Sequence, residues 1–399
     1  MNELFLSNAL IALEEGFKRG CVLISDGRIG EVVEDEPGGV ANRFDLGGAY
    51  LAPGMIDIHI HGSAGVDVME ADAAALRKLS QFLLAEGVTG YFATLVPTDD
   101  RGYKAALAEI DSYIKRQNET ERNGGEPSGA RLLGVHFEGP FVSPARSGAL
   151  APAHFRQYDG DPSAIEIFTE QATARLMTLA PEIAGGIDLI RDLSRRGVRL
   201  FIGHTQADPQ TLDLAVKAGA RHITHFPNAL DPLHHRKPGA VGWGLVRGDV
   251  TVDCIADFQH VHPLMLELII RSKTVDHVAL ISDAILPTGL GDGEFRVWGE
   301  RISVRNGKTA LAAGPAEGTI AGSVITMNQA LKNVIGMGVA PDKAIRMATI
   351  VPARAAGVDL DVGSIEVGKR ADLVVFDKDF NVRMGIIGGK VAFDSRPSN

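Results

Sequence analysis

Cysteine is almost absent from the sequence: Cys21 and Cys254 are the only two thiols in 399 residues. Two isolated cysteines argue against a disulfide framework and make a poor zinc cage. No apolar run reaches the roughly 18 residues that a membrane helix requires. The first residues lack the basic start and apolar core of a secretory signal. We therefore expect a soluble, cytoplasmic protein.

Basic residues are also outnumbered, because 40 lysines and arginines stand against 50 aspartates and glutamates and leave a formal net charge of −10. This balance argues against nucleic acid as a partner, although a local basic pocket for an anionic substrate remains compatible with it. The length predicts one large domain with a smaller one beside it. A chain of this size buries enough surface to fold without disulfides.

Strand-like apolar segments alternate with helix-like segments through the middle of the chain. Several helical segments end at a glycine that leads directly into the next strand, as at Gly87, Gly197 and Gly219, and glycine is the usual residue just past a helix. The repeat is typical of an α/β fold, a (β/α)8 TIM-like barrel, with an open doubly wound sheet as the alternative. The expected strands span residues 55–61, 88–96, 132–138, 174–179, 198–204, 221–225, 250–256 and 277–283, and helix periodicity marks residues 73–85, 187–196, 212–218 and 264–271.

The two ends of the chain differ from the middle, because they hold short strands separated by turn signals. We therefore predict that residues 1–53 and 350–399 together form one small β-sandwich domain, and that residues 54–349 form the catalytic barrel. The glycine-rich stretch 289–323 should elaborate the last barrel loop. The polar segment 117–129 is expected to be a solvated loop.

His59 and His61 lie one residue apart at the end of the first expected strand. Alternate side chains on a strand point to the same side, so both imidazoles can bind one zinc or iron ion. The pair alone is weak evidence, because a lone buried histidine is often a hydrogen-bonded core residue and a second pair, His260 and His262, occurs in a loop. The interpretation therefore depends on further ligands at the ends of other strands.

Acidic and imidazole side chains do stand at the ends of other strands. In a barrel the carboxyl ends of all strands gather at one mouth, where active sites form. Because each of these strands is otherwise largely apolar, the polar ends predict a metal-dependent hydrolytic site. The additional candidates are Glu138, His204, His225 and Asp283.

Several longer motifs resemble the amidohydrolase superfamily over essentially the whole chain. The broad resemblance rests on residues 55–62, 282–284 and 371–377. A narrower resemblance, to the N-acetylglucosamine-6-phosphate deacetylase family within it, rests on residues 136–141, 203–205, 224–230, 236–239 and 318–323. Each motif alone is weak, and together they are specific. The resemblance implies the barrel fold and hydrolysis of N-acetylglucosamine 6-phosphate to glucosamine 6-phosphate and acetate.

The resemblance implies that Glu138, His204 and His225 bind the main catalytic metal, at a site where many superfamily members use a carboxylated lysine. His59 and His61 match the ligands of a second metal that only some members carry, and their presence favours two ions over one. Zinc is the divalent metal we favour, although iron, manganese and cobalt accept the same ligands.

The resemblance also implies catalytic and substrate-binding roles. A divalent ion lowers the pKa of a bound water to about 7, so that hydroxide attacks the acetamide carbon near neutral pH. Asp283 takes the water's proton and passes it to the leaving amine, while His260 contacts the substrate and stabilises the oxyanion. Arg236 binds the phosphate from the neighbouring subunit of a homodimer. The other implied substrate contacts are Ala149, Asn228, Ala229, Ala321, Gly322 and Ser323.

One departure from the family pattern concerns the substrate. The loop after Glu138 often contains a histidine in this family, whereas this chain has Leu150. The change removes a polar contact near the substrate, and so it bears on the choice of sugar more than on the reaction. The alternatives are deacetylation of the galactosamine epimer, another amide hydrolase or deaminase of the superfamily, and a non-catalytic scaffold.

Overall fold

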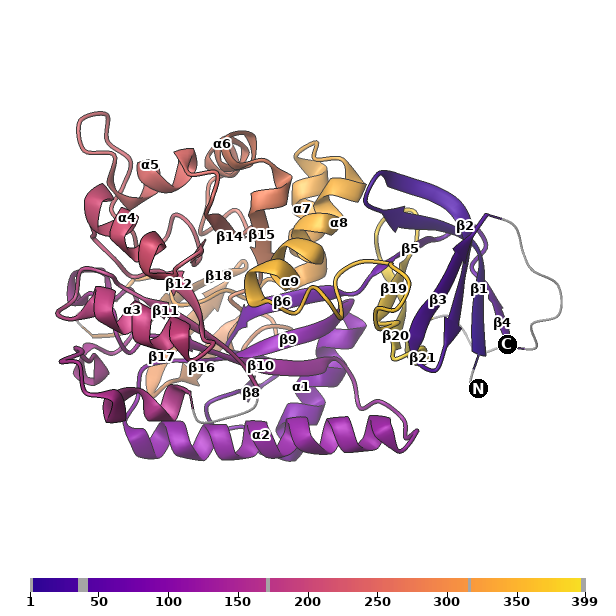
Figure 1. Cartoon of the computed structure of the whole chain (residues 1–399), viewed down its shortest axis with the longest axis horizontal. Coiled ribbons are helices and arrows are strands. Elements are labelled where there is room, and N and C mark those ends of the chain that lie inside the picture. Colours follow the sequence, from indigo (N-terminus) through magenta and orange to yellow (C-terminus); the bar gives the residue numbers. More distant parts are fainter. Residues whose placement is uncertain (1–2, 35–41, 170–172, 315–316, 396–399) are drawn as a thin grey trace.

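The computed structural model describes residues 3–34, 42–169, 173–314 and 317–395. Its larger part is a barrel of eight parallel strands with helices around it (Figure 1). Its smaller part is a β domain to which both ends of the chain contribute. The predicted fold class is therefore confirmed.

Every predicted barrel strand is present, and the strands neighbour one another in chain order. The last strand returns to the first, where Ile60 and Ala284 form a parallel bridge. Two hydrogen bonds complete this seam, from the Asp283 N–H to the His59 carbonyl (2.9 Å) and from the His61 N–H to the Ala284 carbonyl (2.8 Å). The barrel strands are β6 (Met55–Ile60), β9 (Val88–Leu95), β10 (Arg131–Glu138), β11 (Ala174–Leu179), β12 (Arg199–Ile202), β13 (His222–Ile223), β14 (Thr251–Ile255) and β15 (Val278–Ile281).

The helices that surround the barrel follow local sequence signals, as α4 illustrates. The Asp208 side chain accepts a hydrogen bond from the Thr211 N–H at its start, Pro209 takes the first helical position, and Gly219, with a φ of 136°, follows its last residue. The helices are α1 (Ala73–Ala85), α2 (Asp100–Arg122), α3 (Gly186–Arg195), α4 (Pro209–Ala218), α5 (Gly239–Val246), α6 (Pro263–Lys273), α7 (Met327–Gly336), α8 (Pro341–Ala348) and α9 (Ile350–Ala356).

The small domain is one hydrogen-bonded sheet that bends around a core of its own. Buried side chains of β1 and β2, such as Leu6 and Val22, belong to one core with Leu51 of the central strand β5 and with Leu373 and Ile386 from the other end of the sheet. Of the ranges predicted for this domain, residues 1–2, 35–41 and 396–399 lie outside the described residues. The strands are β1 (Glu3–Leu13), β2 (Gly16–Ser25), β3 (Arg28–Val33), β4 (Arg43–Asp45), β5 (Tyr50–Pro53), β19 (Leu373–Phe376), β20 (Val382–Ile387) and β21 (Lys390–Asp394).

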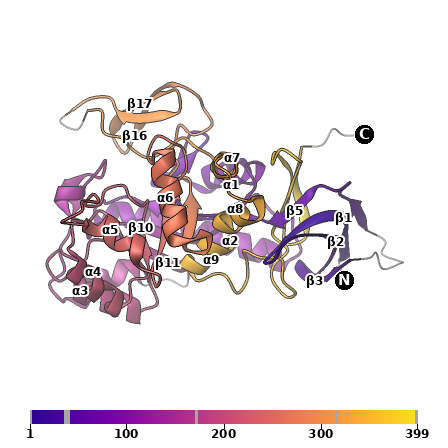
Figure 2. The same cartoon turned by 90° about the horizontal axis from the view of Figure 1, so that it is seen from above.

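A three-stranded antiparallel sheet follows the last barrel strand, as the glycine-rich stretch predicts. It consists of β16 (Gly293–Val297), β17 (Glu300–Arg305) and β18 (Lys308–Leu311), and we call it the flap. Figure 2 shows β16 and β17 projecting from one side of the barrel. A short hairpin, β7 (Gly62–Ser63) and β8 (Val66–Asp67), follows the first barrel strand.

The prediction of a loop over residues 117–129 is wrong in its first half, because α2 continues to Arg122. Gln117 and Glu121 have good helix propensity despite their polarity. Both are also held by tertiary contacts: the Gln117 side chain bonds the backbone of Leu132, and Glu121 accepts two hydrogen bonds from Arg131. Polarity was therefore a poor guide to the end of this helix.

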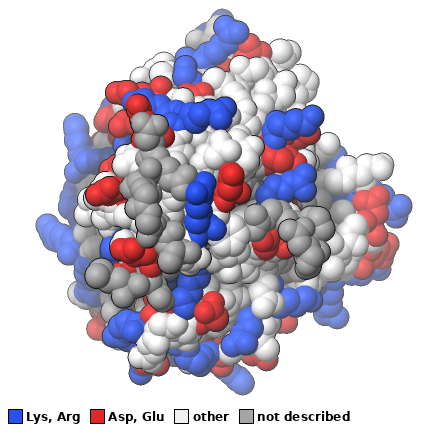
Figure 3. Space-filling model, turned by 90° about the vertical axis from the view of Figure 1, so that its right-hand side faces the viewer, with Lys and Arg blue, Asp and Glu red and all other residues white. Residues whose placement is uncertain are grey.

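The surface of the small domain carries charges of both signs. In Figure 3, which faces that end of the molecule, lysine and arginine side chains alternate with aspartate and glutamate. This face presents no continuous basic surface among the described residues. No helix formed by these residues is both long enough and apolar enough to cross a membrane.

Candidate metal centre

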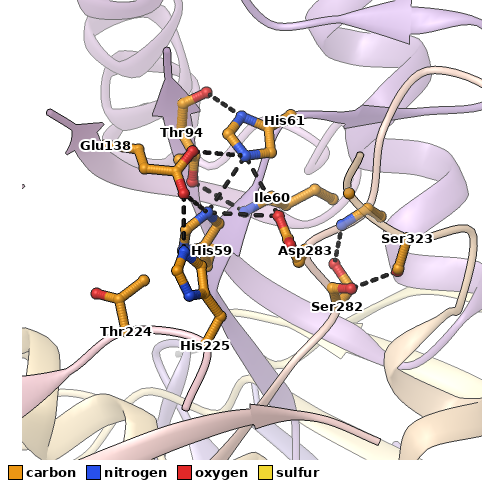
Figure 4. Close-up of polar contacts among 12 residues, drawn as sticks. His59, Ile60, His61, Thr94, Glu138, Thr224, His225, Ser282, Asp283 and Ser323 are labelled. Carbon is orange, nitrogen blue, oxygen red and sulfur yellow. Dashed lines mark hydrogen bonds and ion pairs between the residues drawn. The ribbon is translucent and has the colours of Figure 1, made fainter. Parts of the chain in front are cut away.

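The six predicted metal-site residues converge at the carboxyl ends of the barrel strands, and all are buried. They form two groups of possible ligands, one of Glu138, His204 and His225 and the other of His59, His61 and Asp283. Figure 4 shows the imidazoles of His59, His61 and His225 pointing toward the carboxylates of Glu138 and Asp283.

The first group is the tighter of the two. Glu138 Oε1 lies 2.9 Å from His204 Nε2 and 3.0 Å from His225 Nε2. The two imidazole nitrogens lie 3.1 Å apart. Glu138 ends β10, whereas His204 and His225 each follow their strand by two residues, so three separate strands supply this group.

The second group lies against the first and shares its carboxylate. His59 Nε2 and His61 Nε2 are 3.2 Å apart, and Asp283 Oδ1 lies 3.4 Å and 3.3 Å from them. Glu138 Oε2 lies 3.3 Å from His61 Nε2, while its Oε1 belongs to the first group. Glu138 therefore stands between the two groups and can serve both.

These separations fit a shared cation. Two atoms that each lie about 2.0–2.1 Å from a tetrahedral ion are separated by about 3.4 Å, which is close to the distances in both groups. The tautomers agree, because His61, His204 and His225 each place Nδ1 against a backbone carbonyl, at 3.0, 2.7 and 3.3 Å. An Nδ1–H that donates to a carbonyl leaves the Nε2 lone pair for a metal. His59 differs, since its Nδ1 is buried with no hydrogen-bond partner among the described residues.

Three of the site residues have left-handed backbone conformations, with φ of 47° at His204, 34° at His225 and 49° at Asp283. Non-glycine residues adopt this region at an energetic cost, and they persist there where the surroundings fix them. For His225 the restraint is Asp253 of β14, whose carboxylate accepts the His225 N–H and also bonds His222 Nε2 at 2.8 Å. The turn is therefore held by a buried side-chain acceptor rather than by glycine.

Charges around the site shift its pKa values in opposite directions. Burial alone would lower the pKa of His61, but hydrogen bonds and charge from Asp283 and Glu138 outweigh it and raise that pKa to about 10. Burial is similarly outweighed at His225, where Glu138 raises the pKa to about 9. Burial would raise the pKa of Glu138, but the charge of His59 and hydrogen bonds from imidazoles hold it well below its usual value. The site therefore stabilises positive charge, as a cation site should.

Two buried polar side chains, His136 and Asp57, make hydrogen bonds to the segments that carry the possible metal ligands. Burial holds the pKa of His136 well below its usual value, so its neutral ring donates Nδ1–H to a backbone carbonyl of β6 and accepts from Thr178 at 2.8 Å. Asp57, whose pKa burial raises to about 6, accepts hydrogen bonds from the Ser282 hydroxyl and the His59 N–H. These contacts tie the first strand to the segment that carries Asp283.

A cavity of about 330 Å³ opens beside the ligands. His260 lines it, with Nδ1 bonded to Asp257 at 2.7 Å, so that Nε2 is the nitrogen left for a substrate. The other predicted substrate contacts that line it are Ala149, Asn228, Ala229 and Gly322.

Three predicted substrate contacts lie elsewhere among the described residues. Arg236 is exposed in the loop before α5 and does not line this cavity. Ala321 and Ser323 are buried and do not line it, although Gly322 between them does. Ser323 braces the turn of Asp283, because its N–H donates to the Asp283 carbonyl at 2.7 Å. The roles of all three residues stay predictions.

Sequence reasoning missed three residues at the site. Asp253 carried a usable signal, because it is a charged residue within the apolar segment 250–256. Asp257 gave no such signal. Its hydrogen-bond partner, His260, was identified only through the family resemblance, and that resemblance did not include Asp257. Trp298 lines the cavity from the flap, and a tryptophan between two strands does not by itself indicate a binding site.

Comparison with known proteins agrees with this geometry. Residues 50–392 match the model of the Amidohydrolase family, so the chain belongs to that family. The match includes all eight barrel strands and thus every member of both ligand groups.

Individual relatives point to one kind of amidohydrolase. The chain is 37% identical to N-acetylglucosamine-6-phosphate deacetylase of Bacillus subtilis (strain 168), over 98% of this chain and 97% of that protein. It is 36% identical to N-acetylgalactosamine-6-phosphate deacetylase of Escherichia coli O157:H7, over 92% and 93%. The crystal structure of N-acetylglucosamine-6-phosphate deacetylase from Pasteurella multocida matches with a TM-score of 0.89 and 28% identity, over 98% of this chain and 100% of that one.

Metal binding should release protons from the metal-free protein. His61 and His225, with pKa values raised to about 10 and 9, hold protons at pH 7 that a metal must displace. We expect release of about two protons at pH 7, and metal affinity that rises with pH up to about 10. Zinc titration calorimetry in buffers of different ionisation enthalpy measures the number. Heats that do not depend on the buffer would contradict the picture of protonated imidazoles.

Replacing Asp253 should weaken metal binding without touching a ligand side chain. Asp253→Val leaves the His225 N–H without its acceptor, and we expect metal affinity to fall about 10-fold to 100-fold. Asp253→Asn keeps an acceptor oxygen and should lose less. Competition with a chromophoric chelator measures the affinity. The matched control is Thr251→Val, which removes the Nδ1 partner of His222 and leaves the acceptor of His225 in place. Equal losses in the control and in Asp253→Val would contradict the assignment.

Proposed function

We propose that this chain is a metal-dependent deacetylase that hydrolyses the N-acetyl group of N-acetylglucosamine 6-phosphate to glucosamine 6-phosphate and acetate. The observation that carries the proposal is the convergence of two buried ligand groups on Glu138. These two groups occur in a chain that is 37% identical, over 98% of its length, to an N-acetylglucosamine-6-phosphate deacetylase. Neither fold nor family alone selects this reaction, because amidohydrolase barrels serve many chemistries.

The two ligand groups favour two divalent cations, and we propose zinc as the metal. Glu138, His204 and His225 would hold one ion, and His59, His61 and Asp283 the other. Zinc suits the mixture of imidazole and carboxylate ligands. Such an ion supplies a water of pKa about 7 and a Lewis acid for the carbonyl.

Asp283 is the proton carrier in this proposal. Burial would raise its pKa, but the charge of His59 and the hydrogen bond with His61 lower it, so the carboxylate is ionised at neutral pH and can accept a proton. It accepts the proton of the attacking water and then delivers it to the amide nitrogen. This second transfer matters because an unprotonated amine is a poor leaving group.

His260 and Arg236 complete the substrate site. With Nδ1 held by Asp257, His260 can present Nε2 to the developing oxyanion across the cavity. Arg236 has a planar guanidinium suited to phosphate, and its exposed position is compatible with service to a neighbouring subunit. We therefore propose a homodimer in which each Arg236 reaches the partner's site.

The galactosamine epimer is the second candidate substrate, because the N-acetylgalactosamine-6-phosphate deacetylase relative is nearly as similar. A non-catalytic scaffold is disfavoured, since all six ligand positions are filled and lie within reach of one another. A deaminase of the superfamily is disfavoured by the near full-length similarity to deacetylases.

Acetate release from four sugars tests the proposal. N-acetylglucosamine 6-phosphate should be hydrolysed with the highest kcat/KM, the galactosamine epimer more slowly, and the two unphosphorylated sugars least. A higher kcat/KM for the galactosamine phosphate would establish the second candidate. No acetate from either phosphate by zinc-loaded protein would contradict deacetylation.

Asp283→Asn separates chemistry from binding. The amide cannot carry a proton, so kcat should fall about 10²-fold to 10⁴-fold, while metal analysis still finds the ion bound by Glu138, His204 and His225. The control is Asp188→Asn on the exposed face of α3, which should leave kcat unchanged. Substantial activity in Asp283→Asn would show that another group moves the proton.

A further inference from the structure

Trp298 holds an unusual place in the flap. It forms the two-residue turn between β16 and β17 together with Gly299, and both have positive φ, of 54° and 82°. Asparagine and glycine are the usual residues in such a turn, because left-handed backbone crowds a bulky side chain. Strain of this kind persists where surrounding contacts fix it, and it gathers at functional sites.

The contacts that fix Trp298 belong to the metal centre and its cavity. The indole packs edge-on against the ring of His61, with centroids 4.9 Å apart and planes at 75°. It also packs against two hydrophobic clusters, one that contains Leu150 and one that contains Ala321. The turn therefore points this side chain into the cavity rather than toward solvent, and Trp298 lines the same space as Asp283 and His260.

The indole nitrogen is the unexplained part of this arrangement. Nε1 of Trp298 is buried and has no hydrogen-bond partner among the described residues. A buried donor without an acceptor costs free energy, and a phenylalanine would make the same apolar contacts without that cost. The other tryptophan, Trp243, follows the usual rule, because its Nε1 donates to Asp213 at 3.0 Å. Among the described residues the N–H of Trp298 therefore lacks an acceptor, which a bound molecule can supply.

We propose that Trp298 is a substrate-binding residue whose indole packs on the pyranose ring and whose Nε1–H donates to a hydroxyl oxygen of the sugar. The inference rests on the proposed function. A pyranose suits this wall, because it offers C–H groups to an aromatic surface and hydroxyl oxygens to a donor. Leu150, buried at the same wall, offers no polar atom, so Trp298 supplies the donor there.

Trp298→Phe keeps an aromatic ring and removes only the N–H. Loss of one neutral hydrogen bond should raise KM for N-acetylglucosamine 6-phosphate about fivefold to tenfold, with kcat changed less than twofold and metal content unchanged. A merely structural role would instead lower thermal stability and leave KM unaltered. KM within twofold of the unchanged enzyme contradicts the proposal.

Fluorescence gives an independent readout, because the chain has only two tryptophans. In zinc-loaded protein carrying Asp283→Asn, which binds substrate without turnover, N-acetylglucosamine 6-phosphate should change the indole emission. The change should persist when Trp243→Phe is added and vanish when Trp298→Phe is added. A response that survives Trp298→Phe contradicts the proposal.

The two levels of failure are distinguishable. If the unchanged enzyme releases acetate from neither hexosamine phosphate, the proposed function is wrong and this inference falls with it. If the enzyme is active but neither KM nor emission depends on Trp298, only the inference is wrong.

Discussion

The rest of the site depends on the contacts that the carboxylate of Glu138 makes with the surrounding imidazoles. One oxygen meets His204 and His225, and the other lies 3.3 Å from His61, so a single side chain joins both ligand groups. Four imidazoles around one buried carboxylate form a stable arrangement only where positive charge is present, whether as protons or as metal ions. The raised pKa values of His61 and His225 express this requirement.

The barrel positions these side chains through the backbone conformation of the residues that carry them, as well as through side-chain packing. His204, His225 and Asp283 each turn into left-handed conformation two residues after a strand ends, where a regular strand would aim them along the barrel wall. Buried acceptors and backbone hydrogen bonds hold these turns, as Asp253 does for His225. These backbone conformations and hydrogen bonds therefore position the possible ligands together with the packing of their side chains.

The sequence predicted what depends on periodicity and missed what depends on contacts between distant segments. The eight strands and the clustering of His59, His61 and Glu138 followed from apolar runs with polar ends. The extension of α2 to Arg122 was not predicted. The polar residues there suggested a loop, whereas tertiary contacts stabilise the helix. The position of Trp298 was also unpredictable, since asparagine or glycine is the expected residue at that turn.

The seam that closes the barrel has a consequence for synthesis of the chain. His59 comes from the first barrel strand and Asp283 follows the last, and their backbones are joined by the hydrogen bond from the Asp283 N–H to the His59 carbonyl. More than 200 residues must therefore leave the ribosome after His59 before its group of possible metal ligands is complete. A nascent polypeptide therefore carries His59 and His61 without Asp283 for most of its elongation, and this group of side chains is assembled only when the ring of strands is complete.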